Sequence, residues 1–280
     1  MHRWIIPLLI ILLGSCRPET PDASSEDLRL ISLSPALTGI IEDAGLGDSL
    51  VGRSSWCVLQ NRDQAEVPAV GDLHERDWEA IIRLQPSHVF IQADSVEQDA
   101  SLLDLSREYG WSLHAWPLRG VEDIKVVLHE LPIIVENHAS SRYVSTAGRC
   151  QSLLDRLDES LIPSRIGENQ RILIVNDQIP PLAWGRGTYL DRMLDATAAT
   201  NVIQREGWQQ LSMEDVVRLK PDRVLVVTTF SKIDPPALAR LEDGLVPEDR
   251  CHWLAHPRIN YPGPHLAEAF LAMRAILSGH

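Results

Sequence analysis

Four tryptophans fall in segments that we expect to be loops beside the ends of strands: Trp56, Trp184, Trp208 and Trp253. An indole offers a large, rigid apolar surface with one hydrogen-bond donor. Open α/β sheets bind their ligands beyond the carboxyl ends of the strands, where such loops gather. The tryptophans therefore predict a cleft for a bulky, partly apolar molecule, although each of them alone fits local packing equally well.

Three further residues carry groups suited to a charged or metal-containing ligand. Cys57 and His74 are candidate axial ligands to cobalt or iron, because both metals accept thiolate and imidazole donors. A packed thiol and a solvent-facing imidazole are the alternative interpretation. Arg186 lies between two glycines, which would let the backbone approach a carboxylate, phosphate or carbonyl group closely. A solvated arginine is the alternative there.

The sequence contains no Gly-x-Ser-x-Gly elbow, phosphate-binding Gly-x4-Gly-Lys loop or His-Glu-x2-His pair. We therefore expect a binding protein rather than an enzyme. No catalytic residue and no resident metal or cofactor is assigned, although the bound ligand could itself carry cobalt or iron. A two-lobed α/β fold with a cleft is also compatible with a cofactor-dependent enzyme, which stays as an alternative.

The elements that must position these residues form an internal repeat. Residues 78–89 and 213–224 share Glu, Arg, Leu, Pro and Val at equal offsets. In each copy the apolar residues follow one helical face, a proline ends the helix, and an apolar strand follows. Further buried strands are predicted at 28–33 and 171–176. This alternation predicts an α/β protein with two similar lobes and mainly parallel sheets.

Between the two halves, residues 138–160 are rich in helix-forming residues. A helix of that length reaches about 35 Å and could span two lobes; one more packed surface helix is the alternative. Pro132 is expected to end the helix before it. We predict an N-terminal lobe at 28–137, an interlobe helix at 138–160 and a C-terminal lobe at 165–280. Lobes joined in this way hinge only slightly, with the ligand in the cleft between them.

The N-terminus has the pattern of an export signal. A cationic start precedes about ten apolar residues, too few for the roughly 20 of a membrane-spanning helix. Residues 1–15 are predicted to be removed, and Leu13 to Cys16 resembles a bacterial lipobox, in which the cysteine is lipidated. An ordinary signal peptide is the alternative. Residues 16–27 form a polar, lipidated tether. We expect an exported lipoprotein, anchored in a membrane and facing the periplasm or the cell exterior.

The formal net charge of −13 argues against a nucleic-acid partner, because counterion release requires clusters of Lys and Arg. Besides Cys16 there are three cysteines, Cys57, Cys150 and Cys251. An odd number outside the cytoplasm leaves at least one free thiol or a bond to another molecule. We expect a monomer.

A series of short motifs extends along most of the mature chain, from about Leu28 to Ile276. They are Ile31–Thr38, Gly45–Gly52, Val70-Gly71, Asp77–Pro86, Gly185–Asp191, Asn201-Val202, Gly207-Trp208, Leu211–Pro221 and Tyr261–Leu266. Their order and spacing resemble the helical-backbone (class III) periplasmic solute-binding proteins of ABC importers. That family includes vitamin B12-binding, iron-siderophore-binding and haem-binding proteins.

The resemblance implies a ligand class. Trp56 and Trp208 match aromatic positions of the B12-binding members, whereas Val58 to Gln60 departs from the family pattern beside Cys57. We expect a corrinoid ligand, partly because no cluster of basic residues is present for an anionic siderophore. Ferric siderophore or haem is the alternative. A lipoprotein that senses its ligand and signals to a partner is an alternative of another class.

The resemblance also implies a partner. Glu79 and Glu214 occupy equivalent positions of the repeat, each at the start of a helix. Acids favour helix N-termini through the helix dipole, which is the simpler interpretation. The resemblance implies instead that each lobe presents its glutamate to a basic pocket of a two-fold symmetric permease dimer, which would set orientation.

Overall fold

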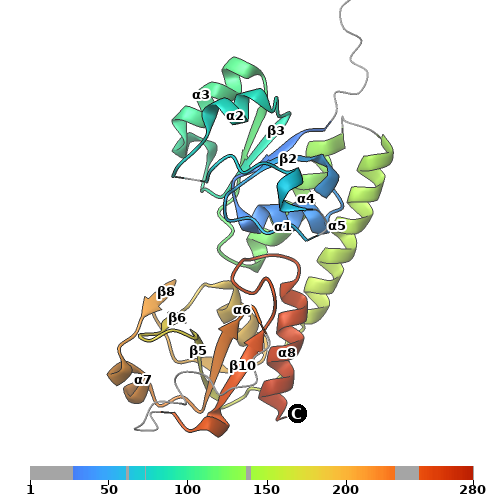
Figure 1. The fold of residues 1–280 in the computed structure, drawn as a ribbon. Coiled ribbons are helices and arrows are strands. Elements are labelled where there is room, and N and C mark those ends of the chain that lie inside the picture. The colour runs from blue at the N-terminus through green and yellow to red at the C-terminus, as the bar shows by residue number, and fades with distance from the viewer. Residues whose placement is uncertain (1–27, 61–62, 73, 137–139, 231–245, 280) are drawn as a thin grey trace, which may run out of the picture.

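The computed structural model describes residues 28–60, 63–72, 74–136, 140–230 and 246–279. The predicted signal peptide, Cys16 and the tether lie outside these residues. Two α/β lobes lie one above the other, and a group of helices runs along one side of both (Figure 1). None of the described helices is long and apolar enough to cross a membrane.

The N-terminal lobe is built on a four-stranded, fully parallel sheet with the order β2-β1-β3-β4. Its strands are buried on both faces in the centre, as parallel strands covered by helices usually are. The strands and helices are β1 (Leu30–Ser32), α1 (Pro35–Asp43), β2 (Leu50–Arg53), α2 (Trp78–Arg83), β3 (His88–Ile91), α3 (Ala100–Tyr109), β4 (Ser112–Ala115) and α4 (Val121–Val135). Short 3-10 turns occupy Gly47–Ser49, Gln64–Glu66 and Val96–Gln98.

The C-terminal lobe contains a six-stranded sheet in which β10, β9, β5, β6 and β8 follow one another and β7 pairs with β5. Strands β7, β9 and β10 run parallel to their neighbours, whereas β6 and β8 are antiparallel. The predicted α/β fold with mainly parallel sheets is confirmed, and the β6–β8 extension is an addition that the repeat did not predict. The elements are β5 (Arg171–Asn176), β6 (Leu182–Trp184), α6 (Tyr189–Asp195), β7 (Thr200–Asn201), β8 (Trp208–Gln210), α7 (Met213–Leu219), β9 (Arg223–Thr228), a 3-10 turn (Glu248–Arg250), β10 (Cys251–Ala255) and α8 (Leu266–Ser278).

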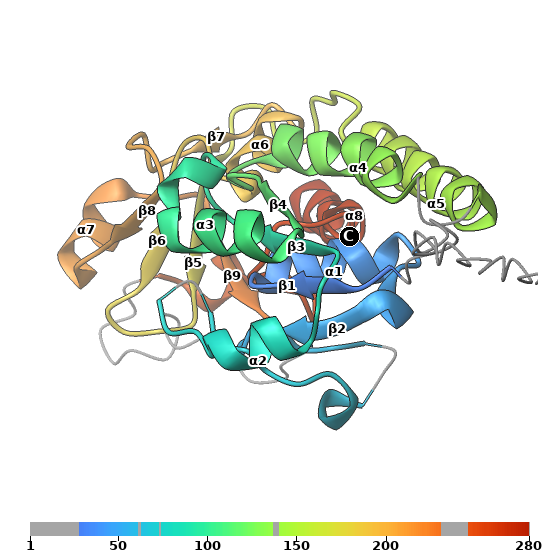
Figure 2. The ribbon, with the colours of Figure 1, turned by 90° about the horizontal axis from the view of Figure 1, so that it is seen from above.

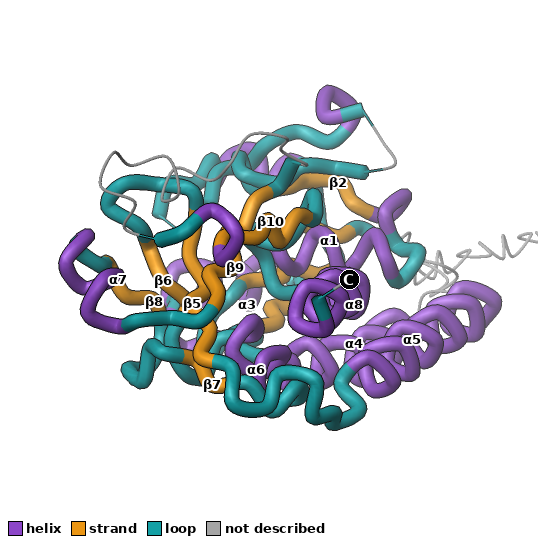
Figure 3. Tube along the Cα trace, turned by 90° about the horizontal axis from the view of Figure 1, so that it is seen from below, coloured by secondary structure: helices purple, strands orange, loops and turns teal. Residues whose placement is uncertain are grey.

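A single long helix, α5 (Ser140–Ser160), runs from the N-terminal lobe down to the C-terminal lobe (Figure 1). It packs against α4 and α8, and the three lie side by side in the views from above and below (Figures 2 and 3). Residues 138 and 139 of the predicted interlobe helix lie outside the described part of the chain. The helix joins the lobes as the fold prediction required.

The expectation that Pro132 ends a helix is wrong, because Pro132 lies inside α4. A proline in a helix interior removes one backbone hydrogen bond and costs about 3 kcal/mol. The same stretch of α4 buries Leu128, Leu131, Pro132 and Val135 against the core. Burial of each large apolar side chain contributes about 1.5–3 kcal/mol, which offsets the cost of the proline.

One hydrophobic core continues through both lobes. It includes Phe90 of the N-terminal sheet, Leu157 of α5, Ile174 of the C-terminal sheet and Phe270 of α8. Each sheet has a separate second core on its opposite face. The lobes therefore share packed side chains on the helical side, which limits how far they can move apart, because packed interiors deform little.

Candidate ligand-binding cleft

The two lobes approach each other closely where two glycine-containing loops meet. A Cβ atom on Gly120, just before α4, would lie 3.9 Å from the carbonyl oxygen of Gly187, just before α6. Gly120 is held in place because its N–H donates to the carboxylate of Asp123 at 3.0 Å. A cavity of about 560 Å³ opens beside this contact and is lined by both lobes. The structure thus places a cavity between the lobes.

Arg186 lies at the tip of a rigid loop that faces this cavity. The hydroxyl of Thr188 donates to the Gly185 carbonyl at 2.8 Å, and the Gly187 N–H donates to the Asp191 carboxylate at 3.0 Å. The guanidinium of Arg186 is exposed while its backbone is fixed. A ligand would therefore meet an arginine whose backbone position is set before binding, so that only its side chain remains to be ordered.

A second loop, residues 205–207, is hydrogen-bonded to the loop that contains Arg186. The N–H groups of Gly185 and Arg186 donate to the carbonyls of Gly207 and Arg205, each at 2.8 Å. Only glycine fits at 185, because a Cβ there would lie 2.2 Å from the Arg205 carbonyl oxygen. Trp208 follows Gly207 directly and begins β8, where its side chain is 49% exposed. The two loops therefore bring Arg186 and Trp208 to the same part of the C-terminal lobe.

Acidic and basic groups are mixed around the interlobe cavity. Burial, together with the neighbouring charge of Asp191, raises the pKa of Asp195. The lining offers hydrogen-bond donors and acceptors, with four acidic side chains against two arginines. The charged residues that line the cavity are Glu122, Arg186, Asp191, Arg192, Asp195 and Glu206.

The N-terminal lobe presents a second, smaller cavity of about 250 Å³ that contains Trp56 and His74. The indole N–H of Trp56 donates to Oδ2 of Asp72 at 2.9 Å, and Oδ1 of Asp72 accepts the backbone N–H of His74 at 2.7 Å. Hydrogen bonds from the Glu75 and His74 backbone and from Trp56 lower the pKa of Asp72 to about 2. The carboxylate is therefore ionised near neutral pH, and it holds the Trp56 ring and the His74 backbone in place. Trp56 is nevertheless 69% exposed.

Three of the predicted ligand contacts are not presented in this way. Trp184 and Trp253 lie within strands β6 and β10 rather than in loops. Trp184 is buried in the shared core, and Trp253 packs with the second core of the C-terminal sheet. The thiol of Cys57 is buried and lies 2.9 Å from the hydroxyl of Thr38. Strand burial and packing account for all three.

Some cavity residues were not assigned from the sequence. Ser34, Asp72 and Gln92 line the cavity around Trp56, and Gly120 borders the interlobe cavity. Ser34 and Gln92 directly follow the region where β1 and β3 end, and the Ser34 hydroxyl donates to the Gln92 side chain at 2.9 Å. Their position after a parallel strand was the signal that could have identified them.

The two predicted docking glutamates occupy matching exposed positions. Glu79 is the second residue of α2, whose N-cap Asp77 accepts the Ala80 N–H. Glu214 is the second residue of α7, whose N-cap is Ser212. Both helices lie on the side of their lobe away from α5 (Figure 1). No ion pair within the described residues involves either carboxylate.

Cysteine and metal chemistry give no further site. The three cysteines within the described residues, Cys57, Cys150 and Cys251, are free thiols. The described part of the chain contains no group of three or more His, Cys, Asp or Glu side chains that could hold a metal ion.

Comparison with known proteins finds similarity in both sequence and fold. Residues 30–107 match a family model described as "Periplasmic binding protein". The chain is 23% identical over 224 residues to an "Uncharacterized ABC transporter substrate-binding lipoprotein YvrC" of Bacillus subtilis (strain 168), covering 73% of this chain and 67% of the relative.

Solved structures share the fold. The periplasmic vitamin B12 binding protein BtuF of Vibrio cholerae superposes with a TM-score of 0.69 at 18% identity, covering 89% of this chain and 96% of that one. A periplasmic haem-binding protein from Pseudomonas aeruginosa gives a TM-score of 0.64 at 21% identity, covering 90% and 92%. The chain therefore shares the fold of these periplasmic binding proteins, and residues 30–107 are similar to the family model.

Proposed function

We propose that this chain is the substrate-binding lipoprotein of an ABC importer, and that it captures a corrinoid between its lobes and delivers it to the permease. The name of the Bacillus relative supports the transport role. A lipid on Cys16 would hold the molecule at the membrane, with residues 17–27 as the tether. Glu79 and Glu214 would dock it on the two halves of the permease.

The mixed charge of the interlobe cavity is the observation that carries the ligand class. Two arginines, Arg186 and Arg192, lie there beside four acidic residues: Glu122, Asp191, Asp195 and Glu206. A corrinoid carries several neutral amide arms, which need both donors and acceptors. Haem carries two carboxylates and would favour an excess of cations. The lining therefore fits an amide-rich periphery better than a dianionic one.

The exposed aromatic groups support a large planar ligand. Trp56 on one lobe and Trp208 on the other are 69% and 49% exposed. Exposure of an apolar indole surface to water is unfavourable. Packing a ligand ring on that surface would contribute about 25 cal/mol of binding free energy per Å² of apolar surface buried. Asp72 fixes the Trp56 ring through its N–H, so little side-chain entropy is lost when a ligand packs on it.

A haem or ferric siderophore ligand is the second candidate, and His74 is compatible with it. The imidazole is exposed and lines the cavity of Trp56. Iron accepts imidazole as an axial ligand, and so does cobalt. Cys57 is not proposed for this role, because its buried thiol packs against Thr38.

A titration of the soluble chain from Arg17 onward tests the proposal. Cyanocobalamin, cobinamide, haem and a ferric siderophore are each added, with binding followed by tryptophan fluorescence and calorimetry. We expect saturable one-to-one binding of the corrinoids. Tyr109→Ala, which removes an exposed aromatic side chain from α3, serves as the control and should bind like the wild type.

The outcomes separate the alternatives. Binding of haem or siderophore alone would keep the carrier and replace the corrinoid. Binding of none of the four ligands, by a chain that melts cooperatively, would contradict the proposed function. Release of a Cys16→Ala variant from the membrane fraction would test the anchor separately.

A further inference from the structure

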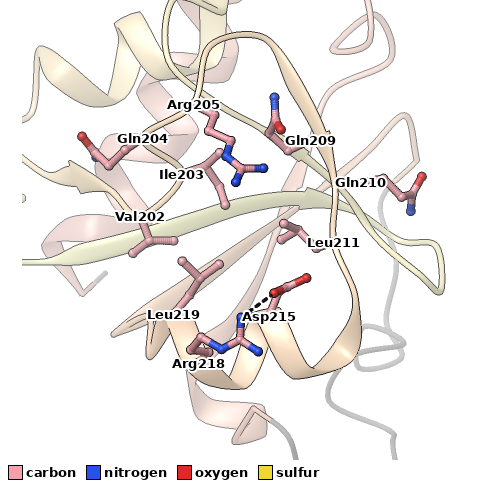
Figure 4. A pocket seen from close by; sticks show the side chains of 10 residues that line it. All are labelled: Val202, Ile203, Gln204, Arg205, Gln209, Gln210, Leu211, Asp215, Arg218 and Leu219. Carbon is pink, nitrogen blue, oxygen red and sulfur yellow. Dashed lines mark hydrogen bonds and ion pairs between the residues drawn. The ribbon is translucent and has the colours of Figure 1, made fainter.

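The C-terminal lobe contains a second cavity, of about 330 Å³, on the flank of α7. Its floor is formed by Val202, Ile203, Leu211 and Leu219 (Figure 4). Gln204 borders both this cavity and the interlobe cavity, so the two lie on either side of one short segment. None of the residues predicted to contact the ligand lines the cavity on α7.

The rim of this cavity carries two guanidinium groups. Arg218 pairs with Oδ1 of Asp215 at 3.2 Å, while Oδ2 of Asp215 is held by Ser212. Arg205 is exposed and has no ion-pair partner within the described residues. Figure 4 shows the two arginines approaching the apolar floor from opposite ends. A chain with a net charge of −13 thus presents a local excess of positive charge around an apolar depression.

The cavity lies next to the proposed docking glutamate. Asp215 lines the rim, and Glu214 precedes it in the first turn of α7. Adjacent Cα atoms are about 3.8 Å apart, so a surface that engages Glu214 would also lie close to the rim of the cavity. An interface that buried the apolar floor would gain free energy there, whereas the rim charges would select the partner.

The N-terminal lobe differs at the start of its docking helix. In the repeat, Trp78 of α2 matches Met213 of α7. The guanidinium of Arg76 lies 5.2 Å from the centre of the Trp78 ring and also pairs with Asp99. An indole–guanidinium pair therefore lies at the start of α2, where α7 has Met213, so the two docking helices offer their partner different surfaces.

We infer that the cavity on α7 is a socket for the permease, and that it receives a bulky apolar side chain flanked by a carboxylate on a permease loop. This inference rests on the proposed docking through Glu214. The apolar side chain would fill the floor, and the carboxylate would pair with Arg205. Because α2 begins with the Trp78–Arg76 pair where α7 has Met213, the permease would bind the two lobes unequally, although each lobe contributes one glutamate.

The test measures the affinity of the full-length lipoprotein for its permease–ATPase complex in nanodiscs. Gln209→Trp fills the socket from β8, and Arg205→Glu reverses the rim charge. Arg250→Glu, on an exposed 3-10 turn of the same lobe, makes the same charge change elsewhere. We expect Kd to rise about tenfold for each of the first two variants and less than about twofold for Arg250→Glu, since tenfold is about 1.4 kcal/mol.

A Glu214→Arg variant distinguishes failure of the socket from failure of the proposed docking through Glu214. Loss of docking in Glu214→Arg with unchanged Kd in Gln209→Trp and Arg205→Glu would overturn the socket and leave docking intact. Unchanged Kd in all three would overturn both. Melting temperatures of the variants identify any that fail to fold, and either socket variant alone then decides the outcome.

Discussion

The two lobes share one scaffold down to individual hydrogen bonds. Before β1, the guanidinium of Arg29 donates to the Leu84 carbonyl at the end of α2, at 2.7 and 3.0 Å. At the start of β5, Arg171 makes the same contact with Leu219 at the end of α7, at 2.9 Å. In both lobes the backbone carbonyl of this arginine also accepts an N–H that follows the proline, at 2.8 Å.

The shared scaffold includes its strained positions. Gln85 and Lys220 precede the two prolines, and both have left-handed backbones, with φ of 44° and 46°. A non-glycine residue in that region costs roughly 1–2 kcal/mol. The same cost at the same place in both lobes indicates that the helix–proline–strand turn is fixed by the repeat and is not a local accident.

The lobes differ in the loops and strands that carry the candidate ligand-binding residues. The N-terminal sheet stays parallel and carries Trp56 and His74 in loops, whereas the C-terminal sheet gains the antiparallel β6–β8 pair that carries Trp208. An indole–guanidinium pair lies at the start of α2, and a cavity borders α7. The repeat thus supplies equivalent positions for docking, and the unequal additions supply the surfaces that recognise ligand and partner.

The largest effect on transport is expected from charge reversal of the two proposed docking glutamates. We expect Glu79→Arg with Glu214→Arg to reduce transport of the ligand at least about 100-fold, because two attractive pairs become repulsive. Uptake by cells that carry the variants measures the effect, and ligand affinity should be unchanged. Glu108→Arg, on the exposed end of α3, is the control. Normal uptake by the double variant would contradict docking through these residues.

In each lobe, burial strongly lowers the pKa of a histidine. Burial lowers the pKa of His114 to about 4, and burial with the nearby charges of Arg258 and His256 lowers that of His265 to about 3. In the unfolded chain both histidines have their ordinary pKa of about 6.5. Below that pH the unfolded state therefore binds more protons than the folded state. Stability should therefore fall as the pH drops from 6.5 towards 4, by about 3 kcal/mol for each histidine at pH 4.

Denaturant unfolding between pH 4 and 8 measures this loss. His114→Phe and His265→Phe should each flatten the slope, and the effects should add because the two residues lie in different lobes. A slope that is unchanged in both variants would show that other groups cause the acid sensitivity.

The two capping arginines sharpen the comparison with a smaller effect. Arg29 donates to the carbonyls of both Leu84 and Gln85, and its side chain is partly buried, whereas Arg171 is exposed and has a single such contact. We expect Arg29→Ala to lower the free energy of unfolding by about 2 kcal/mol and Arg171→Ala by about 1 kcal/mol. Thermal unfolding measures both, with the exposed Arg83→Ala as the control. Equal losses would mean that the extra contact contributes nothing.

Sequence periodicity predicted the scaffold better than the site. The strands at 171–176 and in the second copy of the repeat were found because continuous apolar runs bounded by turn residues are typical of buried parallel strands. The β6–β8 pair was missed because strands of three residues are too short to show a pattern. Trp184 was misplaced for the same reason.

The site itself depends on long-range contacts that no local pattern contains. Glycines beside Arg186 predicted a close backbone approach, and the partner turned out to be the loop before Trp208. Asp72 fixes Trp56 from 16 residues away. The helix through Pro132 likewise depends on tertiary burial that outweighs the local preference of proline.

Calorimetric titration of cyanocobalamin into wild type, Trp56→Ala, Trp208→Ala and the double variant tests most directly whether the ligand is held between the lobes. We predict one site per chain, a loss of affinity of about tenfold or more in each single variant, and a larger loss in the double variant. One-to-one binding that is weakened by one of the two substitutions and not by the other would place the ligand on a single lobe and contradict the account.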